Sequence, residues 1–149
     1  LDYGNALYAN LPSRLLHKLQ TVQNDAAPLI FKVPRRTCAT PLLRDLHWLS
    51  ITQRVVFKAM CIVHRAAHGA LSGPLDNCCW VYAPSRALDS STTVRMVTPG
   101  FNKTTMGGRS FTAWAPRHWN LLQMNLRTEP GYLPFRILLK TYLFWQHSL

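Results

Sequence analysis

The helical character of this chain is clearest in SITQRVVFKAMCIVHRAAHG, residues 50–69. Ser50 and Gln53 have the spacing of a capping box, in which the serine hydroxyl accepts from a backbone N–H and the glutamine side chain reaches back to the cap. Gly69 can adopt the left-handed conformation that commonly follows a helix. The stretch therefore predicts a helix that runs to His68. Its expected buried stripe is Val55, Ala59, Ile62, Val63 and Ala66.

Two further helices are expected before this one. Apolar residues at helical spacing predict a helix over residues 13–27, and we expect Pro28 to end or kink it because proline lacks the backbone N–H. Thr40 and Pro41 predict the start of a short helix over about 41–48, since threonine is a common cap and proline fits the first helical position. The expected buried face of the first helix is Leu15, Leu19, Val22 and Ala26.

The second half of the chain is less regular. Aromatic and apolar spacing predicts a helix face over residues 111–122, interrupted by a proline, and a final helix over about 133–144. Between them and the central helix, residues 74–81 could form one short helix. Residues 92–97 are rich in β-branched side chains, so they predict a short strand, in a small hairpin near 92–111.

Together these patterns predict one mainly α domain or fragment with about five amphipathic helices. Its expected parts are a helical part over 1–69, an irregular part with a possible hairpin over 70–110, and a C-terminal helical part over 111–149.

The composition fits a folded domain with a strong positive charge. The chain has 149 residues, of which 48% are hydrophobic and 15% charged, a balance that can bury a core and argues against general disorder. Lysine and arginine total 17 against 6 acidic residues, which gives a net charge of +11. Such a field attracts polyanions, of which nucleic acid is the most common and an anionic membrane surface the second.

The sequence lacks the features that would indicate a membrane-spanning or secreted protein. No apolar run approaches the ~20 residues that span a bilayer, so we expect no transmembrane segment and no membrane partner. The N-terminus lacks a basic flank followed by an apolar stretch, so we expect no secretory signal. Four cysteines are too few for a disulfide framework, and reduced thiols in the nucleus or cytoplasm are the default. Leu1 stands in place of an initiating methionine, and we expect a fragment of a longer protein.

The acidic residues argue against metal-dependent catalysis. A polymerase or nuclease needs clustered carboxylates to hold divalent metal ions. The chain has no phosphate-binding glycine loop with its lysine, and no nucleophile elbow. We therefore expect no enzymatic activity, no cofactor and no small-molecule substrate. The acids are isolated along the sequence: Asp2, Asp25, Asp45, Asp76, Asp89 and Glu129.

One group of side chains has the chemistry of a zinc site. Cys61, His64 and His68 lie on one helical face, with Cys78 and Cys79 downstream, and sulfur and imidazole are preferred zinc ligands. Structural zinc sites usually place their ligands in tight pairs on turns, whereas Cys61 falls among core positions. We therefore favour a buried cysteine with solvated histidines, and no metal.

The basic residues are the candidate functional residues, and we expect them to contact phosphates rather than bases. They are concentrated near residues 32–36, 54–58 and 103–117: Lys32, Arg35, Arg36, Arg54, Lys58, Lys103, Arg109 and Arg117. Tryptophans could stack on unpaired bases, although on apolar faces they more often pack a core. They are Trp48, Trp80, Trp114, Trp119 and Trp145.

As a set, several phrases resemble the C-terminal region of vertebrate LINE-type (non-LTR) retrotransposon polyproteins. They cover nearly the whole chain, in order and at similar spacing. They are LDYGNALYANLP (1–12), KLQTVQN (18–24), TPLLRDLHWL (40–49), RVVFK (54–58), AHG (67–69), GRSF (108–111), APRHWN (115–120) and FRILLKTYLF (135–144).

The resemblance implies descent from a reverse transcriptase, an RNA-directed DNA polymerase. It places the chain after the polymerase palm, in the thumb and beyond, where a helical region would grip a template–primer duplex or element RNA by its phosphates. The paired-aspartate motif of the palm and the nuclease residues are absent from this sequence. Pro28 departs from the family pattern, and so does Asp89, where a phosphate contact is expected.

The resemblance therefore implies a non-catalytic nucleic-acid-binding segment of a transposable element. Two alternatives remain. The chain could be a decayed or stand-alone fragment with no specific activity, or it could be a helical protein-interaction module. In the second case its apolar stripes would have faced the missing polymerase palm or another protein.

Overall fold

The computed structural model describes residues 11–70, 81–83, 94–100 and 110–146, together with Gly4, Tyr8 and Ala9. Within these residues the fold is mainly α, as the sequence predicts. The helices are α1 Ser13–Phe31, α2 Ala39–Asp45, α3 Ile51–Ala67, α4 Phe111–Leu121, α5 Met124–Arg127 and α6 Tyr132–Trp145.

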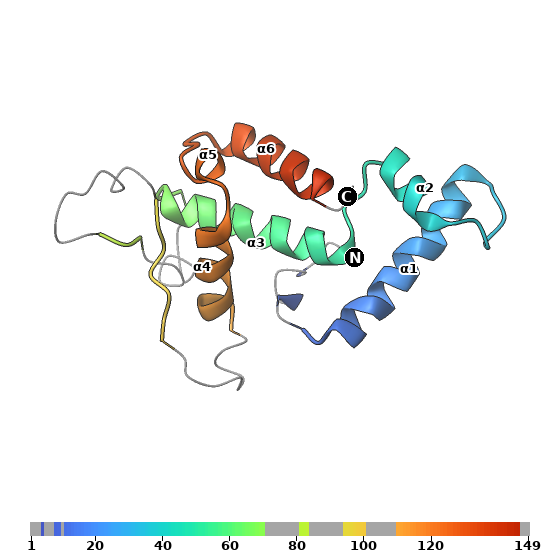
Figure 1. The fold of residues 1–149 in the computed structure, drawn as a ribbon, viewed down its shortest axis with the longest axis horizontal. Coiled ribbons are helices and arrows are strands. Elements are labelled where there is room, and N and C mark those ends of the chain that lie inside the picture. Colours follow the sequence, from blue (N-terminus) through green and yellow to red (C-terminus); the bar gives the residue numbers. More distant parts are fainter. Residues whose placement is uncertain are drawn as a thin grey trace.

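The long helix α3 lies at the centre of the arrangement (Figure 1). α4 and α6 pack against it, while α1 and α2 form a helical hairpin that reaches α3 mainly through α1. None of the described helices combines the length and the apolar character that a membrane crossing needs.

Both ends of α3 follow the predicted local signals. The Gln53 backbone N–H donates to Ser50 Oγ (3.4 Å), and the Ser50 backbone N–H donates to Gln53 Oε1 (2.9 Å), which completes the capping box. At the other end Gly69 has φ +64°, and the N–H groups of Gly69 and Ala70 donate to the carbonyls of Ala66 and Arg65. This pattern is a Schellman motif, so the predicted helix and its glycine stop are confirmed.

The hydrophobic core lies where α3, α4 and α6 meet. Trp119 and Phe135 are fully buried, with ring centroids 5.8 Å apart. Aromatic pairs of this kind add to the free energy gained by burying their area. Of the stripe predicted on α3, three residues are buried, whereas Ile62 and Ala66 are half-buried. The buried α3 residues of the core cluster are Ala59, Met60, Cys61 and Val63.

Helix α1 corrects the prediction that the helix ends near residue 27, at Pro28. The helix continues to Phe31, and Pro28 lies buried inside it. Lys32 then adopts φ 53°, and the Val33 N–H donates to the Pro28 carbonyl (3.1 Å) in a second Schellman closure. Proline costs ~3 kcal/mol in a helix interior, and burial of the Pro28 ring opposes this cost.

The buried face of α1 also differs from the prediction. Leu15 and Val22 are 42% and 56% exposed, whereas Gln23 is 1% exposed. Gln23 Nε2 donates to the Leu49 carbonyl (2.9 Å), and the Ile51 N–H donates to Gln20 Oε1 (2.8 Å). The inward side of α1 consists of Gln23 with Ala27 and Pro28, and the carboxamides of Gln20 and Gln23 satisfy backbone groups at the start of α3 that would otherwise be buried without a partner.

Helix α2 begins earlier than predicted. Its first residue is Ala39 and its flanking residue is Cys38, so Thr40 is not the cap. Pro41 is tolerated at the third helical position because the first four N–H groups of a helix have no partner within the helix. His47 ends the turn with φ 52°, and the chain then enters the core at Leu49.

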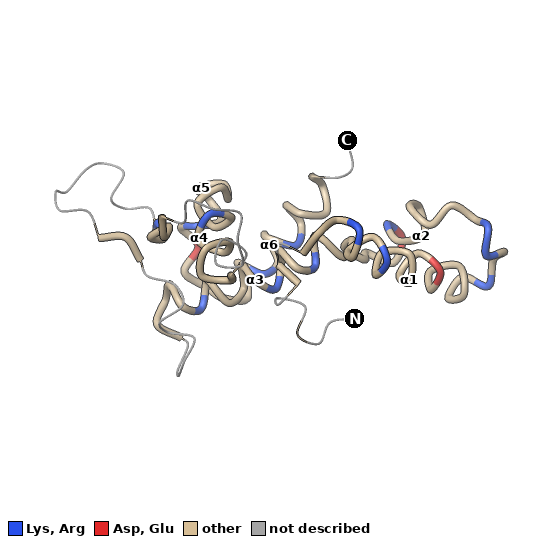
Figure 2. The backbone as a smooth tube through the Cα atoms, turned by 90° about the horizontal axis from the view of Figure 1, so that it is seen from below, with Lys and Arg blue, Asp and Glu red and all other residues tan. Residues whose placement is uncertain are grey.

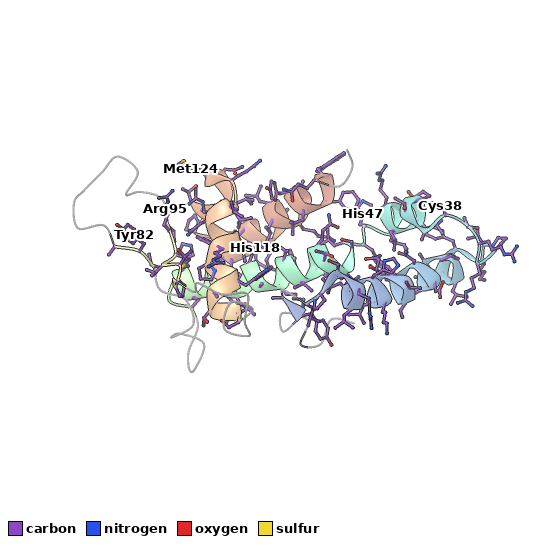
Figure 3. The ribbon with its side chains drawn as sticks, turned by 60° about the horizontal axis from the view of Figure 1, so that its bottom comes forward. Cys38, His47, Tyr82, Arg95, His118 and Met124 are labelled. Atoms are coloured by element: carbon purple, nitrogen blue, oxygen red, sulfur yellow. The ribbon has the colours of Figure 1, made fainter. Side chains whose placement is uncertain are left out.

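The second half contains the short helix α5, which no sequence pattern predicted. Residues 81–83 and 94–100 meet at one isolated antiparallel bridge, Val81 to Met96, where the Tyr82 N–H donates to the Arg95 carbonyl (2.7 Å) (Figure 3). The hairpin predicted near 92–111 and the helix predicted over 74–81 fall largely outside the described residues. Within 94–97, the described part of the predicted strand, only the Met96 bridge is β structure.

The side chains of α4 hold this bridge segment in place. Asn120 Nδ2 donates to the Met96 carbonyl (2.9 Å) while the Met96 N–H donates to Asn120 Oδ1 (3.0 Å). Trp119 Nε1 donates to the Val94 carbonyl (3.0 Å). α4 itself continues through Pro116, which is buried. The bridge segment is thus attached to a helix rather than to a sheet.

Candidate nucleic-acid interface

The predicted phosphate-contacting residues lie in separate places. Figure 2 shows basic residues at the far end of the α1–α2 hairpin and others along the rest of the molecule. The first group is Lys32, Arg35 and Arg36, in the turn after α1; Arg54 and Lys58 lie on α3, and Arg117 is exposed on α4. The remaining predicted residues, Lys103 and Arg109, fall outside the described residues.

The turn after α1 is partly neutralised. Arg35 Nη2 donates to Asp25 Oδ2 at 2.7 Å. The hydrogen bond with Asp25, assisted by its charge, raises the pKa of Arg35 above its ordinary value. An exposed pair of this kind contributes little stability. Its main effect here is to cancel part of the positive charge that this turn offers to a polyanion.

Helix α3 presents its cations along one face. Arg54, Lys58 and Arg65 are spaced by four and seven residues, which keeps them on one side of a helix. They span about 16 Å at the α-helical rise of 1.5 Å per residue. Lys58 and Arg65 are exposed and Arg54 is half-exposed. The row is therefore long enough to meet several successive phosphates of one strand.

Helix α6 extends this row from the other side. The guanidinium carbons of Arg65 and Arg136 lie 5.8 Å and 5.6 Å from the centroid of the Tyr132 ring. Lys58 and Arg136 both lower the pKa of Cys61 electrostatically, so a cation from each helix lies within electrostatic range of this thiol. We call Arg54, Lys58, Arg65 and Arg136 the α3–α6 basic face.

No acidic residue occurs in the sequences of α3 and α6. Neither helix therefore supplies a carboxylate against the α3–α6 basic face, although Glu129, which precedes α6, acts electrostatically on His64 beside Tyr132. The charge pattern of the sequence indicated Arg54 and Lys58 but not Arg65 and Arg136. The seven-residue spacing from Lys58 to Arg65 could have identified the first, whereas only the packing of α6 on α3 reveals the second.

Aromatic rings border the basic face. The Arg54 guanidinium carbon lies 5.6 Å from the centroid of the half-buried Trp48 ring. A pocket of about 350 Å³ adjoins Trp48 and is also lined by Arg44 and Phe144. Tyr132, at the other end, is 37% exposed. Such rings can stack on unpaired bases. Trp119, in contrast, is buried, so the core role holds for this tryptophan.

Cys61 lies beneath the basic face as a neutral thiol. Burial raises its pKa to about 11, against the opposing effects of Arg136, Lys58 and Tyr132. A thiolate is the reactive form of cysteine, and it is scarcely populated at neutral pH when the pKa is so high. Cys61 therefore serves as a core residue, as the sequence predicts, and is not poised for nucleophilic chemistry.

His64 corrects the expectation of a solvated histidine. Its side chain is buried and stacks on Phe135, with ring centroids 4.2 Å apart. His64 Nε2 donates to the Glu129 carbonyl (2.8 Å), while Nδ1 is buried without a partner. Burial lowers the pKa of His64 below its ordinary value, although the Glu129 hydrogen bond opposes this effect. A neutral imidazole packs among aromatic rings at less cost than a charged one.

The zinc hypothesis finds no support in the part of the chain that the structure describes. Within those residues no three His, Cys, Asp or Glu side chains are grouped so that they could hold a metal ion. His64 and His68 are neighbours, with ring centroids 4.4 Å apart. Cys78 and Cys79, the other two candidate ligands, lie outside the described residues.

Comparison of this chain with family models, curated proteins and solved structures found no match. The resemblance to retrotransposon reverse transcriptases therefore stays a prediction from the sequence.

Proposed function

We propose that this chain binds the sugar–phosphate backbone of RNA or DNA through the α3–α6 basic face, without catalysis. The observation that carries the proposal is the convergence of cations from two helices that contain no acid, around the Tyr132 ring. Lysine and arginine at this spacing neutralise phosphates irrespective of base sequence. The net charge of +11 adds long-range attraction.

The bordering aromatic residues suggest how an unpaired strand would lie. Phosphates would follow Arg54, Lys58 and Arg136, and a base would reach Trp48 or Tyr132 by displacing a guanidinium that lies over the ring. Stacking of this kind contributes ~1–3 kcal/mol per base and tolerates any sequence. We therefore expect single-stranded RNA or DNA to bind with little sequence preference.

The resemblance to the region after the palm of a reverse transcriptase supports the same function. In that interpretation the segment holds nucleic acid in the nucleus or cytoplasm while other parts of a longer polyprotein carry out chemistry. The acids in the described part of the chain, Asp25, Asp45 and Glu129, are far apart in sequence, and Asp25 pairs with Arg35.

Fluorescence anisotropy with a labelled single-stranded RNA and a labelled DNA duplex tests the proposal. If the four cations each neutralise one phosphate, affinity should fall about 150-fold for the duplex and about 50-fold for a single strand between roughly 50 and 200 mM salt. Absent binding, or binding that ignores salt, contradicts the proposal.

A matched pair of double variants locates the interface. K58Q/R136Q removes two cations from the α3–α6 basic face, whereas K32Q/R36Q removes two from the turn after α1, so both have the same net charge. We expect K58Q/R136Q to reduce the dependence of log affinity on log salt by about half, as two of four phosphate contacts are lost. K32Q/R36Q should keep most of the salt dependence. If both double variants reduce the salt dependence equally, only the total charge of the chain determines binding, and the proposed interface is wrong.

A protein-interaction module is the second candidate function. The observation that favours it is the exposed apolar side of α1, where Leu15, Val22 and Leu29 lie open to solvent. Exposed apolar patches on folded domains commonly mark interaction sites.

A further inference from the structure

Helix α1 carries an apolar row along its length, in which exposed residues alternate with the half-buried Leu19 and Ala26. We define the α1 stripe as Pro12, Leu15, Leu19, Val22, Ala26 and Leu29. Successive members are separated alternately by three and four residues, which is the spacing of a coiled-coil seam. The three members Leu15, Val22 and Leu29 are 42%, 56% and 76% exposed, because α1 packs on α2 and α3 with the adjacent side, which holds Gln23, Ala27 and Pro28.

The charges beside the stripe indicate what covers it. Lys18 and Asp25 are seven residues apart, so they lie on the same edge of the stripe. In an antiparallel pair of α1 helices, Lys18 of each copy faces Asp25 of the other, which gives two opposite-charge contacts. In a parallel pair, Lys18 would face Gln23 and Asp25 would face Ile30, and no charge would be matched. The edge is therefore complementary to itself in the antiparallel orientation only.

The apolar layers agree with the same register. When Lys18 faces Asp25, Leu19 faces Val22, Leu15 faces Ala26 and Pro12 faces Leu29 across a two-fold axis. Large side chains meet smaller ones, as close packing requires. Arg35 already hydrogen-bonds Asp25 Oδ2, and the second carboxylate oxygen can accept from Lys18 of the other copy.

We propose that two copies of this chain associate through the α1 stripe, antiparallel, with Lys18 of each copy against Asp25 of the other. The stripe lies on α1, whereas the α3–α6 basic face lies on other helices. The proposed dimer and the proposed nucleic-acid binding can therefore be tested independently, and failure of one does not affect the other. A symmetric interface of this kind is the commonest arrangement in homo-oligomers.

Sedimentation equilibrium over a range of protein concentrations tests the proposal, with far-UV circular dichroism to confirm that each variant stays folded. The unmodified chain should show a monomer–dimer equilibrium. K18E should weaken the dimer about 10-fold, because a carboxylate then faces Asp25 in both contacts, and like charges in register are unfavourable. The double variant K18E/D25K should restore the affinity to within about threefold, because the opposite-charge contacts are re-formed in reversed order.

Two further variants distinguish this interface from non-specific hydrophobic association. L29S should weaken the dimer, whereas L133S, which alters a 65% exposed leucine on α6, should not. A chain that stays monomeric at every concentration refutes the proposal. So does a double variant that associates no better than K18E, or an L133S variant that weakens the dimer as much as L29S does.

Discussion

The orientation of α1 can be tested by comparing two neighbouring residues. Gln23 is 1% exposed and its carboxamide donates to the Leu49 carbonyl, while the adjacent Val22 is 56% exposed. In the variant Gln23→Leu, the Leu49 carbonyl would lose its side-chain donor inside the protein. Leaving such a group unpaired costs about 1–3 kcal/mol, and extra apolar burial by leucine offsets part of this, so we expect a net loss of about 1–2 kcal/mol.

The comparison variant is Val22→Thr, which changes an exposed side chain and should alter the free energy of unfolding by less than about 0.5 kcal/mol. Urea denaturation followed by tryptophan fluorescence measures both, at a protein concentration low enough to keep the chain monomeric. The opposite ranking, with Val22→Thr more damaging than Gln23→Leu, would mean that α1 buries its apolar stripe and that the observed orientation is wrong.

Other predictions concern the α3 cap and the titratable core. Ser50→Ala should lower the free energy of unfolding by about 1 kcal/mol in the same urea assay, because the capping box is lost. Burial lowers the pKa values of His64 and His118, so the unfolded chain takes up protons first on acidification. Stability should therefore be complete above pH ~6.5 and fall as the pH drops below it, by at most about 1.4 kcal/mol per pH unit for each histidine, and His64→Phe should flatten the profile. In a thiol-labelling assay at about pH 8, the exposed Cys38 should react much faster than Cys61, whose pKa is raised to about 11. Equal labelling rates in the folded chain would contradict the burial of Cys61.

Local signals explain what the sequence could predict. The ends of α3 depend on residues within one turn, Ser50 with Gln53 and Gly69 with its neighbours. They can therefore be predicted from the sequence without knowledge of the tertiary structure. The buried face of α1 was predicted wrongly because it depends on Leu49 and Ile51, whose backbone groups bind Gln23 and Gln20. Periodicity alone could not foresee hydrogen bonds across 26 and 31 residues. The short α5 carries too few residues to show a period.

Only part of the candidate interface could be predicted, because the sequence shows local charge density but not which helices pack together. Charge density along the sequence pointed to Arg54 and Lys58, but also to the turn after α1, where Asp25 cancels part of the charge by pairing with Arg35. Arg136 is distant in the chain and joins the basic face only because α6 packs against α3. Proximity in space, not in sequence, makes the difference between these two groups of cations.

The α1–α2 hairpin contributes no residue of its own helices to the main buried cluster, which begins at Leu49. Its attachment to α3 includes the carboxamide hydrogen bonds of Gln20 and Gln23. We therefore expect the amide protons of α1 and α2 to exchange with solvent deuterium faster than those of α3, α4 and α6, through local openings that precede global unfolding.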